Sequence, residues 1–444
     1  MSDFLTSLIA VVAVLGFMIL IHEFGHYIVA KWLGVRVEQF AIGFGKRLVG
    51  FHKGDTDYRI NAIPLGGYVK MSGENPMDER SDDPREFMNH PRWHRFLIAI
   101  AGPTMNILLA IVLLTTVYMV HYEYAAVDDE PTVIGWVFKD SAAAKAGFHV
   151  GDRITRVDDV QNPTWKQVEM KAAMNPGQPL AVEVERNQQK LNMTVVPEAT
   201  GVDQIGFAGW APKENTVTIT DLQSNMPAER AGLKEGDQIL TLDGKPVPAL
   251  GAMSDSLEVT KDKPIVLTVL RNGQQKTFTV QPVLAPGDNR YRIGIGSLQT
   301  KVKTLPFAEA LRLSLHENRQ NALLILELVK KMAERKMSLR SIEGPIRIGQ
   351  AAGEAARSKG WTPLMGLTAA ISLNLGIFNL LPIPILDGGV ILFLLIEGLM
   401  RRDISMSIKE RVYQAAFVFL VLFAVMVIYN DLMKTIPGLA DKLP

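Results

Sequence analysis

Residues 4–26 read FLTSLIAVVAVLGFMILIHEFGH, an apolar run that ends in three polar side chains. No charged residue occurs from Phe4 to Ile21, and a helix of this length extends about 27 Å, close to the thickness of a bilayer core. A secretory signal peptide is the alternative interpretation. However, no basic residue precedes the run, and it leads into His22 and Glu23 instead of a small-residue cleavage site. We therefore expect a membrane-spanning helix.

Three further uncharged runs are long enough to span, or nearly span, a bilayer: Phe96–Val120, Trp361–Leu386 and Val412–Asn430. The sequence thus predicts a polytopic α-helical membrane protein with four transmembrane helices. Basic residues flank the first two spans on one side and fill the loop between the last two, which places both regions in the cytoplasm. They are Lys31, Arg36, Lys46, Arg47, Lys53, Arg59, Arg92, Arg95, Arg401, Arg402, Lys409 and Arg411. Both termini and the large segment 122–360 then lie outside the cytoplasm.

Composition excludes several classes of protein. The 444 residues include 47 Lys and Arg against 46 Asp and Glu, so no overall positive field favours binding to nucleic acid. The chain has no cysteine, which excludes disulfides, thiolate metal sites and cysteine proteases. Any metal must therefore be bound by nitrogen and oxygen ligands.

The segment outside the cytoplasm contains a repeat. Residues 143–158 read AAKAGFHVGDRITRVD, and residues 228–243 read AERAGLKEGDQILTLD, an offset of 85 residues. Such a period fits two copies of one small domain better than a solenoid unit. In each copy a short alanine-rich helix ends at a glycine, a Gly-Asp turn follows, and alternating strands come next. Between two apolar runs of the second copy, Asn272-Gly273 predicts a hairpin.

The motif HEFGH places His22 and His26 at positions i and i+4, on one face of a helix. Two imidazoles at this spacing can bind one Zn²⁺, because a helix holds them in place before the metal arrives. Glu23 lies between them and is not needed as a ligand. It is therefore free to accept a proton from the attacking water, as a general base does in metal-assisted amide hydrolysis.

A catalytic zinc needs a third protein ligand, and Asp387 is the best candidate. It directly follows the third apolar run, which crosses the membrane in the same direction as the first, so both motifs approach the cytoplasmic side at a similar depth. Pro382 and Pro384 interrupt helical hydrogen bonding before it, and Gly388-Gly389 permits close backbone approach after it. We expect a water-accessible cavity at this break.

HEFGH, the stretch NLLPIPILDGG at 379–389 and the repeated domains between helices together resemble the site-2 protease family of intramembrane zinc proteases. The resemblance extends over essentially the whole chain. It implies that His22, His26 and Asp387 bind Zn²⁺, that Glu23 is the general base, and that Asn379 holds substrate or stabilises the oxyanion. An interhelical hydrogen bond is the alternative role for Asn379.

The resemblance also implies a domain plan. The two repeats resemble bacterial PDZ domains, of the α+β class, and a membrane-associated β-hairpin is expected after the first helix. The plan places the first helix with its motif at 1–35, the cytoplasmic-side loop and hairpin at 36–95, the second helix at 96–121, the PDZ-like domains at 128–213 and 214–300, amphipathic interfacial helices at 301–360, the third helix with Asp387 at 361–400, and the fourth at 410–432.

The family further implies the substrates and the compartment. Those substrates are transmembrane segments of single-pass proteins, such as anti-sigma factors after a first cleavage and remnant signal peptides. The protein would lie in the bacterial inner membrane with its PDZ-like domains in the periplasm, contacting lipid, substrate segments and periplasmic peptides, and no nucleic acid.

The sequence leaves several alternatives open. The PDZ-like domains bind peptides at a sheet edge or act as spacers and size filters without a ligand. The hairpin edge binds an unwound substrate or is an ordinary surface feature. Two classes of protein are alternatives to a protease: a membrane-anchored peptide-binding scaffold with a structural metal, and a metal transporter. A transporter usually has inverted repeats, which the four runs do not show.

Overall fold

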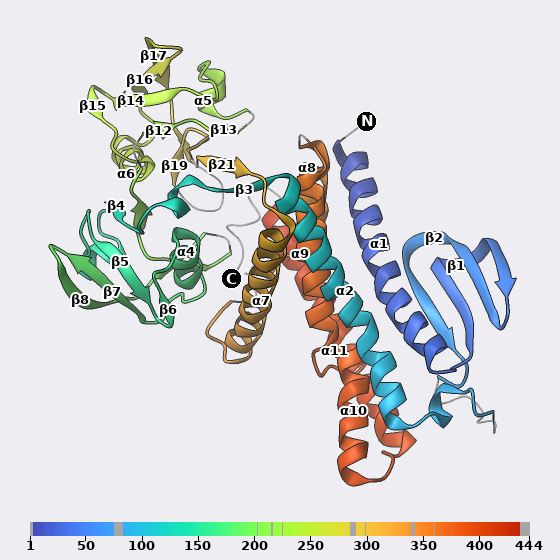
Figure 1. The fold of residues 1–444 in the computed structure, drawn as a ribbon. Coiled ribbons are helices and arrows are strands. Elements are labelled where there is room, and N and C mark those ends of the chain that lie inside the picture. Colours follow the sequence, from blue (N-terminus) through green and yellow to red (C-terminus); the bar gives the residue numbers. More distant parts are fainter. Residues whose placement is uncertain are drawn as a thin grey trace. The chain divides into compact units, whose positions relative to one another are not determined.

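The computed structural model describes residues 3–74, 83–201, 203–214, 216–223, 225–284, 290–297, 299–338, 342–358 and 360–435. The chain forms two compact units (Figure 1). The first comprises Met1–Tyr122, Lys303–Glu327 and Glu343–Asp431, and the second comprises Glu123–Val302, Leu328–Ile342 and Leu432–Pro444.

The first unit is built on long helices. α1 (Asp3–Trp32) packs along α2 (Arg92–Val120), and α2 also packs against α9 (Thr362–Asn379) and α10 (Asp387–Met400) (Figure 1). The other helices that lie wholly or partly in this unit are η1 (Phe87–Asn89), α7 (Phe307–Ala333), α8 (Pro345–Arg357) and α11 (Met406–Thr435).

Within the described ranges, three segments are long and apolar enough to cross a membrane: Leu5–Trp32, Arg92–Val120 and Ser407–Lys434. They match the first, second and fourth predicted spans. The apolar composition of these helices explains their exposed side chains, because Leu, Val and Phe residues on their surface are stable against lipid but not against water. The protein is therefore a membrane protein.

The third predicted span is not one continuous helix. α9 ends at Asn379 and α10 begins at Asp387, and the stretch between them contains Pro382 and Pro384. Neither proline has an N–H to donate to a helical hydrogen bond, which is the physical reason for the break. The predicted interruption is thus confirmed, whereas the count of four spans stays a prediction.

Two glycines let the broken stretch fold back on the start of α10. A Cβ atom on Gly388 would lie 2.1 Å from the carbonyl oxygen of Leu381, and one on Gly389 would lie 2.4 Å from that of Ile383. Both distances are far below a van der Waals contact. Ile385 has a φ of 101°, a left-handed conformation that is strained for a β-branched residue. The chain therefore tolerates local strain to place Asp387 at the first position of α10.

Buried polar contacts hold both ends of α11. Near its start, Lys409 Nζ lies 2.6 Å from a carboxylate oxygen of Glu397 on α10. Near its end, the carboxylate of Asp431 accepts hydrogen bonds from the backbone N–H groups of Gly344, Ile346 and Arg347, and thereby caps the start of α8. The part of α11 between these contacts is mostly exposed, as expected for a lipid-facing helix.

A long β-hairpin follows α1. It consists of β1 (Val37–Lys53) and β2 (Thr56–Met71), which bend so that the first part of β1 pairs on both sides with β2. Ile42, for example, pairs with Ile60 on one side and with Gly67 on the other. Residues 67–71 therefore form one edge of the folded hairpin, and they pack beside α1.

The second unit contains most of the strands. Its first half holds β3 (Tyr122–Ala125), η2 (Ala126–Asp129), β4 (Ile134–Val137), α3 (Ala142–Lys145), β5 (Arg153–Val157), β6 (Val160–Gln161), α4 (Trp165–Ala173), β7 (Leu180–Arg186), β8 (Gln189–Val195), β9 (Glu198–Thr200), β10 (Ile205–Phe207) and β11 (Trp210–Pro212). Its second half holds β12 (Val217–Thr218), β13 (Asp221–Leu222), α5 (Pro227–Arg230), β14 (Gln238–Leu242), β15 (Lys245–Pro246), α6 (Leu250–Thr260), β16 (Ile265–Arg271), β17 (Gln274–Val280), β18 (Val283–Leu284), β19 (Tyr291–Arg292), β20 (Ile295–Gly296) and β21 (Thr300–Lys303).

The two halves repeat one sheet. The first has the strand order β6-β5-β7-β8, and the second has β12-β14-β16-β17 with β15 beside β14. The central hairpins agree in register, since Leu180 pairs with Val195 and Ile265 pairs with Val280. The predicted turn at Asn272-Gly273 is confirmed, because both residues have the positive φ that a tight hairpin turn requires. Each half also has its own hydrophobic core.

Each half contains the same buried ion pair. Arg271 donates from Nε and a terminal nitrogen to the two carboxylate oxygens of Asp237, both at 2.6 Å, and also to the carbonyl of Gly232. In the first half, Arg186 does the same to Asp152 and to the carbonyl of Gly147. Both aspartates are 1% exposed. The arginine thus ties the last part of one strand to the turn that follows the short alanine-rich helix.

Candidate active site

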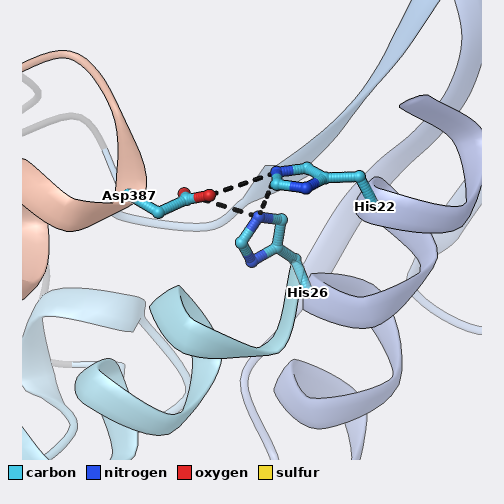
Figure 2. Close-up of side chains that lie close together, drawn as sticks. All are labelled: His22, His26 and Asp387. Atoms are coloured by element: carbon cyan, nitrogen blue, oxygen red, sulfur yellow. Dashed lines mark hydrogen bonds and ion pairs between the residues drawn. The ribbon is translucent and has the colours of Figure 1, made fainter. Parts of the chain in front are cut away.

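Three side chains from distant segments meet in the first unit. His22 and His26 lie one turn apart on α1, and Asp387 is the first residue of α10. Figure 2 shows the three pointing toward one another. His22 Nε2 lies 3.1 Å from Asp387 Oδ2, His26 Nε2 lies 3.5 Å from Asp387 Oδ1, and the two Nε2 atoms are 3.2 Å apart. Both histidines are almost fully buried.

The spacing of these atoms fits a tetrahedral metal ion. Zinc binds histidine nitrogen and carboxylate oxygen at about 2.0–2.1 Å, so two ligand atoms on a tetrahedron are about 3.3–3.4 Å apart. The three measured separations, 3.1, 3.2 and 3.5 Å, lie close to that value. Within the described part of the chain, this is the one group of His, Asp and Glu side chains found close enough together to hold a metal.

Both imidazoles are oriented by contacts with α2. His26 Nδ1 lies 2.7 Å from the carbonyl oxygen of Ile98, which makes Nδ1–H the donor and leaves Nε2 free to bind a metal. His22 Nδ1 lies 3.2 Å from the side-chain amide of Asn106, a fully buried residue. The amide orientation that has Oδ1 facing Nδ1–H leaves His22 Nε2 free in the same way, and it also gives Oδ1 a partner. Such contacts raise the affinity of a histidine for metal.

Close approach of α1 and α2 depends on two glycines. A Cβ atom on Gly102 would lie 2.3 Å from His26 Nε2 and 2.8 Å from His22 Cε1. A Cβ atom on Gly25 would lie 2.5 Å from the carbonyl oxygen of Ala101. Glycine is therefore the residue that allows α2 to cross α1 directly against the two histidines.

Glu23 lies next to the histidines and faces the hairpin. Its Oε2 accepts a hydrogen bond of 3.0 Å from the backbone N–H of Val69. Val69 belongs to the edge formed by residues 67–71. The glutamate expected to act as a base is thus fixed by the backbone of this edge.

A cavity of about 540 Å³ contains the site. Its wall includes His22, Glu23, His26 and Asp387, together with Asn379 from the end of α9. The wall also includes Arg95, Glu397, Lys409 and Tyr413. α10 contributes Asp387, Val390, Phe393, Leu394 and Glu397 to this wall.

The structure therefore brings together His22, Glu23, His26 and Asp387, as the sequence predicted, and it places Asn379 in the same cavity. It also adds two residues of α2, Gly102 and Asn106. The sequence contains a weak indication of both residues, because an asparagine and a Gly-Pro pair interrupt an otherwise apolar span.

Comparison with known proteins gives the family. The model of peptidase family M50 matches residues 10–423. A Vibrio cholerae protein that carries a provisional zinc metalloprotease name is 33% identical, with 97% of this chain and 99% of the relative covered. The regulator of sigma-E protease RseP of Escherichia coli is 30% identical over 97% of this chain and 99% of the relative. The regulator of sigma E protease of Haemophilus influenzae is 30% identical over 97% of this chain and all of the relative.

One solved structure, the PDZ domain of the SdrC-like protein of Listeria monocytogenes, matches 19% of this chain and 90% of its own length, with 16% identity and a TM-score of 0.18. The functional assignment rests instead on the family model and the near-full-length relatives. The chain therefore belongs to peptidase family M50, the site-2 protease family, and is an intramembrane zinc metalloendopeptidase.

Proposed function

We propose that the protein hydrolyses peptide bonds within the transmembrane segments of other membrane proteins, at the site formed by His22, His26 and Asp387. The observation that carries this proposal is the convergence of these three side chains beside Glu23, in a cavity at the break between α9 and α10. Such a cavity provides the water that hydrolysis consumes inside an otherwise apolar region.

Each residue has a distinct role in this proposal. His22 and His26 provide Nε2, and Asp387 provides a carboxylate oxygen, to hold Zn²⁺. When bound, zinc supplies a Lewis acid that polarises the scissile carbonyl and acidifies water. Glu23 accepts the proton of the attacking water and delivers it to the leaving amine, while Val69 keeps the carboxylate in place. Asn379 donates from its amide to the substrate backbone or to the developing oxyanion.

The hairpin presents the substrate in extended form. A transmembrane helix hides its carbonyl groups in its own hydrogen bonds, so the segment around the cleaved bond must unwind. The edge of residues 67–71 lines the cavity and offers backbone groups to which an unwound segment adds as a strand. Apolar side chains of the hairpin, including Leu48, Val49 and Phe51, are exposed, which suits association with a membrane.

The topology, the compartment and the substrates in this proposal are taken from the family and its relatives. In this proposal the chain has four transmembrane helices, with α9 and α10 together as the third, and lies in the bacterial inner membrane with both termini in the periplasm. The two repeats are tandem periplasmic PDZ-like domains at 128–213 and 214–300. Two of the relatives carry the name regulator of sigma-E protease. The proposed substrates are therefore anti-sigma factors after a first cleavage, and remnant signal peptides.

The test separates the base from the metal site. Glu23→Gln retains an acceptor for Val69 N–H but no base, so it should keep zinc and lose proteolysis of a model transmembrane substrate. Asp387→Ala should lose zinc, measured by elemental analysis of the purified protein. Glu38→Gln, on the same hairpin but paired with Lys70, is the matched control and should cleave normally. Equal cleavage by the wild type and Glu23→Gln would refute the base. A zinc-loaded chain that cleaves nothing would instead favour a scaffold with a structural metal.

A further inference from the structure

The hairpin edge beside the catalytic cavity consists of Gly67–Met71. On one side this segment pairs with β1, through partners such as Phe40 for Val69 and Ile42 for Gly67. On its other side, no strand pairs with it among the residues that the structure describes. In an antiparallel sheet the N–H groups of alternate residues face the same side, about 6.7 Å apart. The groups that face the cavity side are therefore those of residues 67, 69 and 71.

Two of these three N–H groups already have carboxylate partners. Val69 N–H donates to Glu23 Oε2 at 3.0 Å, and Met71 N–H donates to Glu74 Oε2 at 3.1 Å. Val69, Met71, Glu23 and Glu74 all line the catalytic cavity. Two side chains thus occupy the positions at which the carbonyl groups of an added strand would bind.

The two carboxylates differ in how easily they can move away from the N–H groups that they accept from. Glu23 lies on the long helix α1, next to two buried histidines, and its position cannot change without moving the base. Glu74 is exposed and lies in the turn that follows β2, three residues from the amide it caps. Rotating its side chain away from Met71 costs one hydrogen bond, which an incoming carbonyl replaces.

We propose that a substrate strand adds to this edge in one register, with its scissile peptide opposite Val69. The substrate carbonyl two residues away then binds Met71 N–H and displaces Glu74 from it. At Val69 the amide is held by Glu23, so the substrate carbonyl at that position has no donor on the edge and is free to turn toward the three metal ligands. Glu74 is then a positioning residue: it keeps the edge capped until a substrate takes its place. This inference rests on the function proposed above.

Kinetics of Glu74 variants give the first test. Glu74→Ala removes the cap, so the KM for a model transmembrane substrate should fall by roughly threefold to tenfold while kcat stays unchanged, because only binding has become easier. Glu74→Gln retains an acceptor for Met71 N–H and should restore a KM close to that of the wild type. Asp55→Ala, which removes an exposed carboxylate from the turn between β1 and β2, should leave KM unchanged. An unchanged or higher KM for Glu74→Ala would refute the cap.

Cross-linking gives the second test, and it measures the register directly. The chain has no cysteine, so single cysteines at Val69 or Met71 react without background. In the Glu23→Gln protein, which is expected to bind substrate without cleaving it, Val69→Cys should form a disulfide under oxidising conditions with a cysteine next to the scissile peptide. Met71→Cys should link two residues further along the substrate. Disulfides formed mainly at other substrate positions would overturn the register. So would disulfides of Val69→Cys and Met71→Cys that do not differ by two substrate residues. Cleavage of the same substrate by the wild type checks the proposed function separately.

Discussion

At the scale of single residues, the metal site depends on a glycine as much as on its ligands. Gly102 lies on α2 directly opposite the imidazoles, and the space that it leaves is filled by His26 and His22. Asn106, one turn further along α2, contacts His22 from the same helix. The geometry of the two histidines is therefore fixed by a second helix and not by the HEFGH motif alone.

A methyl group at position 102 should disturb the metal site. In Gly102→Ala the new Cβ would lie 2.3 Å from His26 Nε2, so the ring or the helix must move. Loss of ligand alignment of this kind typically costs about 10- to 100-fold in metal affinity. We expect zinc content and proteolysis to fall together, measured by competition with a chelator and by cleavage of a model substrate.

The matched control for this substitution is Gly366→Ala in α9, where a new Cβ would contact no atom within 4 Å. Alanine in a helix is more favourable than glycine by about 1 kcal/mol, so this variant should be as stable as the wild type or more so. Normal zinc affinity in Gly102→Ala would contradict the role assigned to Gly102.

At the scale of elements, the break between α9 and α10 is what positions Asp387. Proline ends α9, Ile385 adopts a strained conformation, and Gly388 and Gly389 let the chain lie against the first turn of α10. A continuous helix would have satisfied its backbone but would have left no polar cavity. The strain is thus located at the functional site, where the surrounding packing maintains it.

The β-rich repeats are stabilised by a different local interaction, the buried ion pair of aspartate and arginine. Burial raises the pKa of Asp237, but hydrogen bonds from Arg271 and from the backbone N–H of Lys234 outweigh it, so the pKa is lowered overall. A carboxyl group with a lowered pKa stabilises the fold above about pH 4, where it is charged in both states. This contribution is lost as the pH falls through the pKa of the folded state.

Replacing this aspartate should loosen the second repeat. Asp237→Asn keeps the shape but loses the charge, and hydrogen bonds to charged groups contribute about 1.5–3 kcal/mol each. We expect hydrogen exchange in β14, β16 and β17 of the full-length protein to become faster at pH 7. The difference from the wild type should shrink as the pH falls through the lowered pKa of the wild-type Asp237, because its carboxyl group is then uncharged, like the asparagine amide. A difference that is independent of pH would contradict the electrostatic account.

At the scale of the whole molecule, the repeats and the catalytic unit belong to one chain but have separate cores. If the repeats act as a size filter, a protein that lacks residues 128–298 should cleave a substrate that still carries its bulky periplasmic domain. The full-length protein should require that domain to be removed first. Cleavage assays with trimmed and untrimmed substrates measure this, and an unchanged need for trimming in the shortened protein would count against a filter.

Features that depend on local periodicity could be predicted from the amino-acid sequence. Apolar runs predicted the first, second and fourth spans, which long apolar helices of the structure match. The spacing of HEFGH placed His22 and His26 on one helical face, and an offset of 85 residues revealed the repeated sheet. These succeed because a helix or a hairpin imposes its period on the residues that form it. The break before Asp387 was predicted from Pro382 and Pro384, which cannot donate helical hydrogen bonds, and the structure confirms it.

The contacts between distant groups became visible in the folded molecule. It showed Asp387 against the histidines, Gly102 and Asn106 behind them, and Val69 and Met71 bonded to Glu23 and Glu74. No local pattern specifies these contacts, because they depend on how closely two helices cross and on the register in which a strand edge meets them.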